Sequence, residues 1–152
     1  RGFRARRVSA ARRSDIARFR ILLEQEGAVG SMRQGGLAWE ARLTAAHHSL
    51  SHIEREIERQ GKMGSLLGLW SDAELAFHET LISACEMPVL IETFASIYKQ
   101  FRQQITGLEE AYSPEFLHHI VAEHQAILDA ALSRDEDALR AAIRHHQRRH
   151  FG

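Results

Sequence analysis

Residues 116–150 read FLHHIVAEHQAILDAALSRDEDALRAAIRHHQRRH, and this stretch decides the fold. Apolar residues recur in it every three or four positions, which predicts two amphipathic helices. The pattern breaks at residues 133–135, where Ser133 or Asp135 can cap a helix. The stretch therefore predicts two antiparallel helices joined by a short turn.

Two histidines continue the apolar stripes of these helices. Counted from Arg134, His124 lies ten residues before the turn and His146 lies twelve after it. At about 1.5 Å of rise per residue, the two imidazoles sit within roughly 3 Å of the same level. A buried imidazole loses hydrogen-bonding free energy unless both ring nitrogens find partners. We therefore expect the two rings to share a partner.

The composition bounds the class of protein. The chain has 152 residues, of which 44% are hydrophobic and 26% charged, as in a globular domain with a real core. Two prolines and long stripes of helical period predict an all-α antiparallel bundle of about six helices. Apolar runs are too short for a membrane span or a signal peptide. A single cysteine, Cys85, excludes an internal disulfide and fits a reducing, cytoplasmic setting.

The zero net charge hides an asymmetry. Residues 1–13 carry six arginines and no acid, which leaves 14 basic against 20 acidic residues in the remainder. An acidic body is poorly suited to bind nucleic acid. We expect residues 1–13 to be a linker and residues 14–152 to form the helical domain.

The predicted third helix, residues 70–86, adds two candidate ligands. Glu74 and His78 are one turn apart and share a face with the apolar Phe77. A carboxylate and an imidazole at this spacing can hold one metal ion from one helix. A buried hydrogen bond between the two side chains would give the same pattern, so both interpretations stay open.

Two arginines are candidates for binding an anion. The first helix is expected to begin at Ser14 or Asp15 and to end at the glycines from Gly27 onward, and its spacing turns Arg20 inward. Either Arg20 pairs with Glu24 one turn later, or it binds an anionic ligand. Arg102 flanks the core stripe of the predicted fourth helix, residues 88–111.

Four segments together resemble a known family. The chain is similar to the FCD effector-binding domain of the FadR-like branch of GntR transcription regulators, and its first residues resemble the junction that follows the family's winged-helix domain. That resemblance implies a DNA-binding domain before residue 14. The segments that carry it are Arg20-x-x-Leu23-Glu24, Glu74-x-x-Phe77-His78, Glu123-His124-x-x-Ile127-Leu128 and Ile143-x-x-His146.

The resemblance implies a metal site. Its ligands would be Glu74, His78, His124 and His146, although the family usually has Asp at the first of these positions. Three nitrogens and one oxygen suit Zn²⁺, and also Ni²⁺, Co²⁺, Mn²⁺ or Fe²⁺. The metal-free alternative is that the histidines hydrogen-bond each other or the carboxylate.

The expected function is sensing rather than catalysis. A small carboxylate metabolite would bind the metal and Arg20, with Arg102 as a second anchor. Met87 stands where the family commonly has Asn, which we expect to alter effector selectivity. The protein would form a homodimer and bind operator DNA through its winged-helix domain. The alternative is a metal-dependent hydrolase or isomerase, but the inner faces offer no clear general base beyond the ligands.

Overall fold

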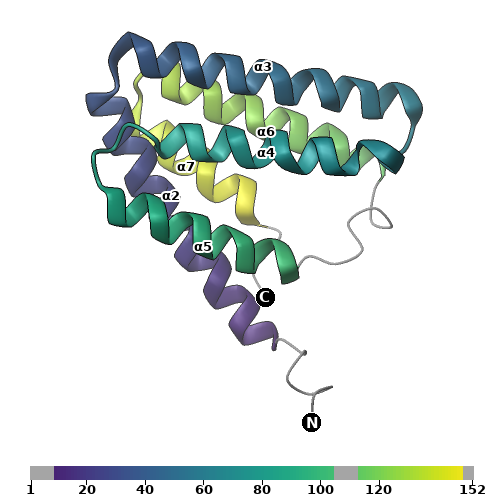
Figure 1. Cartoon of the computed structure of the whole chain (residues 1–152), viewed down its shortest axis with the longest axis horizontal. Coiled ribbons are helices and arrows are strands. Elements are labelled where there is room, and N and C mark those ends of the chain that lie inside the picture. Colours follow the sequence, from purple (N-terminus) through teal and green to yellow (C-terminus); the bar gives the residue numbers. More distant parts are fainter. Residues whose placement is uncertain (1–8, 105–112, 149–152) are drawn as a thin grey trace.

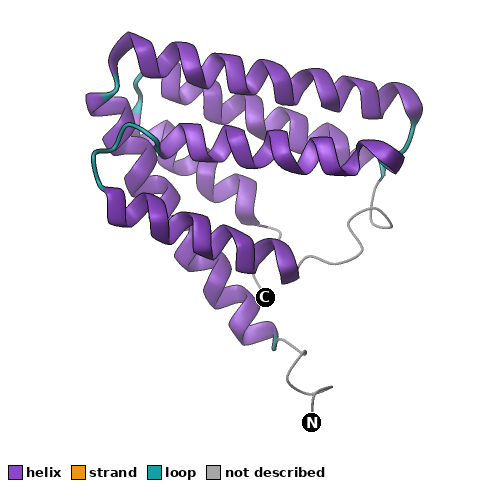
Figure 2. Cartoon of the chain, viewed as in Figure 1, coloured by secondary structure: helices purple, strands orange, loops and turns teal. Residues whose placement is uncertain are grey.

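A computed structural model describes residues 9–104 and 113–148, except the side chains of residues 103 and 104. Within these ranges the chain forms six α-helices and one short 3-10 helix, with no strand (Figure 2). The prediction of an all-α bundle is confirmed. The elements are α2 (Ala10–Gln34), α3 (Gly36–Gln60), η1 (Gly64–Leu66), α4 (Leu67–Ile82), α5 (Pro88–Gln104), α6 (Pro114–Leu132) and α7 (Glu136–Gln147).

The helices pack in a bundle around one main core (Figure 1). The long helix α3 lies along α4 and α6, and α6 and α7 form a hairpin. Helix α2 contacts α4, α5 and α7, so it passes beside all the elements that carry the candidate ligands. Large apolar side chains such as Trp39, Phe77 and Ile127 are fully buried between these layers. None of the described helices is long and apolar enough to cross a membrane.

Helix α2 is longer than the sequence pattern predicts. It begins at Ala10, because the side chain of Ser9 accepts a hydrogen bond of 3.0 Å from the Arg12 backbone N–H. The predicted start at Ser14 or Asp15 is therefore wrong. The first turn, residues 10–13, is exposed and contains no large apolar side chain, so it carries no apolar period that could have marked it.

Gly27 and Gly30 lie inside α2 and do not end it as predicted. A Cβ atom at Gly27 would lie 2.7 Å from the Ile82 side chain, and one at Gly30 would lie 3.0 Å from Cys85 Cβ. These glycines let α2 approach the end of α4 closely, so their role is in packing rather than in ending a helix. The helix continues to Gln34.

The other predicted boundaries mostly hold. Helix α4 ends at Ile82, four residues earlier than predicted. Helix α6 begins at Pro114, with Ser113 as its cap. Of the predicted fourth helix, residues 105–111 lie outside the described residues.

The α6–α7 turn is attached to the adjoining ends of α2 and α3. Its residue Arg134 donates to Glu40 on α3, with an Nη2 to Oε2 distance of 2.8 Å, and also to the Met32 carbonyl on α2. Asp135 caps α7 through the Ala138 N–H, as the sequence predicts. One end of the α6–α7 hairpin is thereby fixed to α2 and α3.

Candidate metal centre

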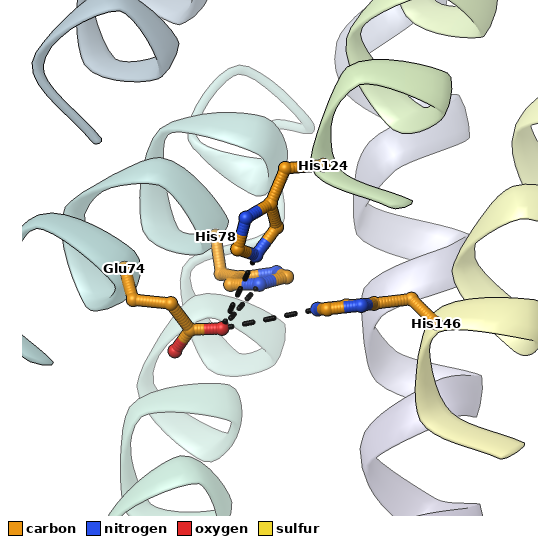
Figure 3. Close-up of side chains that lie close together, drawn as sticks. All are labelled: Glu74, His78, His124 and His146. Atoms are coloured by element: carbon orange, nitrogen blue, oxygen red, sulfur yellow. Dashed lines mark ion pairs between the residues drawn. The ribbon is translucent and has the colours of Figure 1, made fainter. Parts of the chain in front are cut away.

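The structure brings the four predicted ligands together. Glu74 and His78 project from α4, His124 from α6 and His146 from α7, and all four point to one place (Figure 3). One nitrogen or oxygen atom from each lies within 4.8 Å of the others. The side chains are buried, with 0% to 4% of each residue exposed.

One carboxylate oxygen faces three imidazoles. Glu74 Oε2 lies 2.9 Å from His78 Nε2, 3.6 Å from His124 Nε2 and 3.8 Å from His146 Nε2. In a tetrahedral site with metal–ligand bonds near 2.1 Å, neighbouring ligand atoms are about 3.4 Å apart. The observed separations bracket that value. The donor set and its spacing therefore fit a divalent transition metal.

Two of the facing nitrogens lack hydrogen-bond partners. Among the described residues, Nε2 of His78 and Nε2 of His124 are buried and unbonded, because even the 2.9 Å approach of Glu74 to His78 lacks hydrogen-bond geometry. Leaving buried polar atoms unsatisfied costs about 1–3 kcal/mol each. The metal-free alternative predicted that these rings would be hydrogen-bonded at this point. Two buried nitrogens without a hydrogen-bond partner, both aimed at one carboxylate oxygen, fit a metal ligand set better.

The opposite ring nitrogens are all bonded. The Nδ1 atom of each histidine lies against a buried glutamate. In all three pairs the glutamate and the histidine come from different helices. The sequence pattern did not predict these three contacts. The pairs are Glu24 on α2 with His78, Glu54 on α3 with His124 at 3.1 Å, and Glu123 on α6 with His146 at 2.8 Å.

The cluster perturbs its own ionisation. Burial alone would lower the pKa of His124, but the adjacent Glu54 and Glu74 carboxylates outweigh this effect and raise the pKa to about 9. Burial raises the pKa of Glu24, but the charges of His78 and Arg20 lower it to about 2. Burial alone would also raise the pKa of Glu74, but the neighbouring histidines lower it, so Glu24 and Glu74 are held ionised and can balance the charge of a bound cation.

The second oxygen of Glu74 is already occupied. Glu74 Oε1 accepts hydrogen bonds from the Tyr98 hydroxyl and from Arg102 Nη2, the latter at 2.5 Å. Only Oε2 then faces the histidines, so Glu74 can offer a single oxygen to a metal. Arg102 holds this carboxylate in place, and its role as a second effector anchor stays a prediction.

Arg20 is buried beside the cluster, with 1% of its surface exposed. Its guanidinium lies 4.6 Å from the centre of the Phe101 ring and 4.7 Å from that of Tyr98. Its Nε is 3.4 Å from Glu24 Oε1, whereas its Nη2 has no hydrogen-bond partner in the part of the chain that the structure describes. Both predicted interpretations of Arg20 thus retain support.

Met87 lies apart from these groups. It is 52% exposed and immediately precedes α5, and no described contact connects it with the four ligands. The structure thus brings together six of the seven predicted side chains, but not Met87.

Comparison with known proteins agrees with this architecture. The family model of the FCD domain matches residues 15–149. A curated relative, the HTH-type transcriptional regulator BphR of Paraburkholderia xenovorans (strain LB400), is 30% identical over 148 residues. That match covers 96% of this chain and 58% of the relative.

A solved structure has the same fold. McbR/YncC of E. coli superposes with a TM-score of 0.73 at 18% sequence identity, covering 89% of this chain and 60% of that one. The chain thus spans about three fifths of the length of both proteins. The match over nearly all of its length shows that the chain belongs to the FCD domain family.

Proposed function

We propose that this chain is the effector-sensing domain of a bacterial transcription regulator, and that it binds a small carboxylate metabolite at a buried divalent metal. The observation that supports the proposal is the convergence of three imidazole Nε2 atoms and one carboxylate oxygen, two of those nitrogens having no other partner. The first metal to consider is Zn²⁺, with Ni²⁺, Co²⁺, Mn²⁺ and Fe²⁺ as alternatives set by availability.

The chemistry of the site suits an anionic ligand. A divalent ion held by Glu74, His78, His124 and His146 would supply a Lewis-acidic position for a carboxylate oxygen. Arg20 would bind the same anion through Nη2, because this donor is buried and has no described partner. The aromatic faces of Tyr98 and Phe101 fix the guanidinium in position. Hydroxy and keto acids combine the oxygens that such a site can bind.

Regulation would pass through the helices that hold the ligands. Ligand binding that favours one arrangement of α4, α6 and α7 shifts the population of that arrangement. In a homodimer, such a shift would change the spacing of two winged-helix domains that precede residue 14 and read operator DNA in the cytoplasm. A relative named as an HTH-type transcriptional regulator supports this role.

A metal-dependent hydrolase or isomerase is the alternative function. It would use the same ion to polarise a carbonyl group, and it needs a general base close to the ligands. The buried glutamates near the site are each bonded to a histidine. This occupation, together with the relative named as a transcriptional regulator, favours the sensor.

A thermal-shift screen tests the proposal. The 152-residue chain, loaded with Zn²⁺, is screened against a panel of small hydroxy and keto acids. A ligand at a hundred times its dissociation constant adds about 2.7 kcal/mol to stability. We expect at least one acid to raise the melting temperature, and only in the metal-loaded protein. Equal responses with and without metal, or no metal uptake by elemental analysis, would contradict the proposal.

A further inference from the structure

Each metal-facing histidine has its own buried carboxylate on the opposite ring nitrogen. We propose that three glutamates are positioning residues, which keep the proton of each imidazole on Nδ1 and so aim three Nε2 lone pairs at one point. This inference rests on the proposed metal site and extends it to residues outside the ligand set. The three positioning residues are Glu24, Glu54 and Glu123.

The glutamates are themselves fixed by donors other than the histidines. Glu24 bonds Arg20, Glu54 accepts from Trp70 Nε1 at 3.1 Å, and Glu123 accepts from Arg148 Nη1 at 2.8 Å. Their exposed fractions are 0%, 1% and 4%. Because a buried carboxylate without donors is costly, these second contacts define where each oxygen lies before any histidine is bonded.

The chemical reason lies in what a carboxylate can do. An ionised carboxylate only accepts hydrogen bonds, whereas a neutral imidazole has one N–H donor and one lone pair. With a metal ion bound between the rings, each imidazole would keep one proton, and a carboxylate at Nδ1 holds it on that nitrogen. The lone pair is then on Nε2, the nitrogen that faces Glu74 Oε2 in all three rings. An amide at the same place can either accept or donate, so it does not force the tautomer.

The three positioning glutamates come from three different helices of the bundle. Glu24 lies on α2 and Glu54 on α3, and neither helix contributes a ligand. Outer carboxylates that orient metal-binding histidines typically affect metal affinity by about 10-fold to 100-fold. We therefore expect α2 and α3 to set the affinity for the metal without touching it.

Glu54→Gln tests the charge behind His124. Trp70 Nε1 and His124 Nδ1 both lie 3.1 Å from the same oxygen, Glu54 Oε2, so an amide oxygen there can still accept from both, and the change removes the charge with little loss of packing. Glu123→Gln tests the tautomer, because His146 and Arg148 face different oxygens of Glu123, and an amide whose oxygen accepts from Arg148 turns its NH₂ group towards His146 Nδ1. The matched control for Glu54→Gln is Glu56→Gln, which removes one charge from the same helix at a residue paired with Arg59 on the surface. Circular dichroism checks that the variants are helical.

Affinity is measured by titrating Zn²⁺ into the metal-free 152-residue chain against a chromophoric chelator. We expect binding 10-fold to 100-fold weaker in Glu54→Gln and unchanged in Glu56→Gln. Glu123→Gln provides a second variant at a different histidine, should Glu54→Gln fail to fold. Unchanged affinity in the folded glutamate variants overturns the inference.

A spectroscopic readout separates positioning from a general effect on stability. In the Zn²⁺-loaded wild type, nitrogen-15 NMR should find a proton on Nδ1 and metal on Nε2 of His78, His124 and His146. Coordination through Nδ1 would overturn the inference even if affinities fell. If the wild type takes up no Zn²⁺, the proposed function fails along with the inference; if it binds Zn²⁺ and the variants match it, only the inference fails.

Discussion

Replacing Arg20 by Met distinguishes an effector anchor from a structural ion pair. The guanidinium is 1% exposed, and its Nη2 lacks a partner among the described residues, so it is free to bind an anion. A charge-assisted hydrogen bond contributes about 2–3 kcal/mol, and this loss corresponds to an affinity about 30-fold to 150-fold weaker. We expect that decrease for the acid giving the largest thermal shift with the wild type.

The same change has a calculable effect on stability. Met keeps most of the aliphatic packing, but Glu24 loses a partner whose Nε lies 3.4 Å from its Oε1. Removing one partner of a buried ion pair costs about 3–5 kcal/mol. Because Glu24 retains its contact with His78, we expect a smaller loss, about 1–3 kcal/mol, measured by urea unfolding of the metal-free protein.

Isothermal titration of the Zn²⁺-loaded proteins gives the effector affinity, and elemental analysis gives the metal content, which should not change. Arg18→Met, at an exposed position of the same helix, is the matched control and should bind the acid as the wild type does. An Arg20→Met protein that is less stable but binds the acid with unaltered affinity would refute the anchor. Arg20 would then be only a structural partner of Glu24.

Three other predictions concern the metal, pH and packing. A chelator should lower the melting temperature of the wild type but not that of His124→Ala, which lacks a ligand; equal responses would argue against this site. The pKa of Glu24 is lowered to about 2 in the folded protein, so its contribution to the stability of the metal-free protein should be complete above about pH 4.5 and lost as the pH falls towards 2. Acid titration of Glu24→Gln should show no such loss. Gly27→Ala should destabilise the protein by about 1–3 kcal/mol, since its Cβ would lie 2.7 Å from Ile82. Gly68→Ala, with no described atom within 4 Å of its Cβ, should raise the free energy of unfolding by up to about 1 kcal/mol. Urea unfolding that ranks the two variants the other way would contradict the packing role of Gly27.

The ligand set was predictable because helical spacing exposes it. His124 and His146 occupy core positions of two helices joined by a recognisable turn, so their approach follows from helix geometry, and their ring centres are in fact 4.7 Å apart. Glu74 and His78 are neighbours on one helix face. In both cases the deciding contacts are local or pass through a single turn.

The positioning glutamates were harder to predict. Glu54 lies four residues after Leu50 and three before Ile57, so it falls on the buried stripe of its helix, and this signal could have marked it as buried. The histidine that it meets is 70 positions away in the sequence, and only the packing of α3 on α6 decides that pairing.

Helix boundaries failed where tertiary contact overrides local preference. Gly27 and Gly30 look like helix-ending residues in sequence, yet the close approach of Ile82 and Cys85 explains why they are glycine. Ser9 caps a first turn that is exposed and has no large apolar side chain, so periodicity could not detect it. Both errors arise from using local patterns where a distant segment or an exposed turn decides.

The attachment of the α6–α7 turn through Arg134 has a mechanical consequence. Its contacts with Glu40 and Met32 make the turn the natural pivot for any tilt of the hairpin, and His124 lies ten residues from that pivot. At 1.5 Å per residue this lever arm is about 15 Å, so a tilt of 5° displaces the ring by about 1.3 Å. Metal–ligand distances tolerate changes of only about 0.2 Å. A hairpin fixed at one end thus amplifies small rotations into displacements that the ligand atoms at its other end cannot absorb.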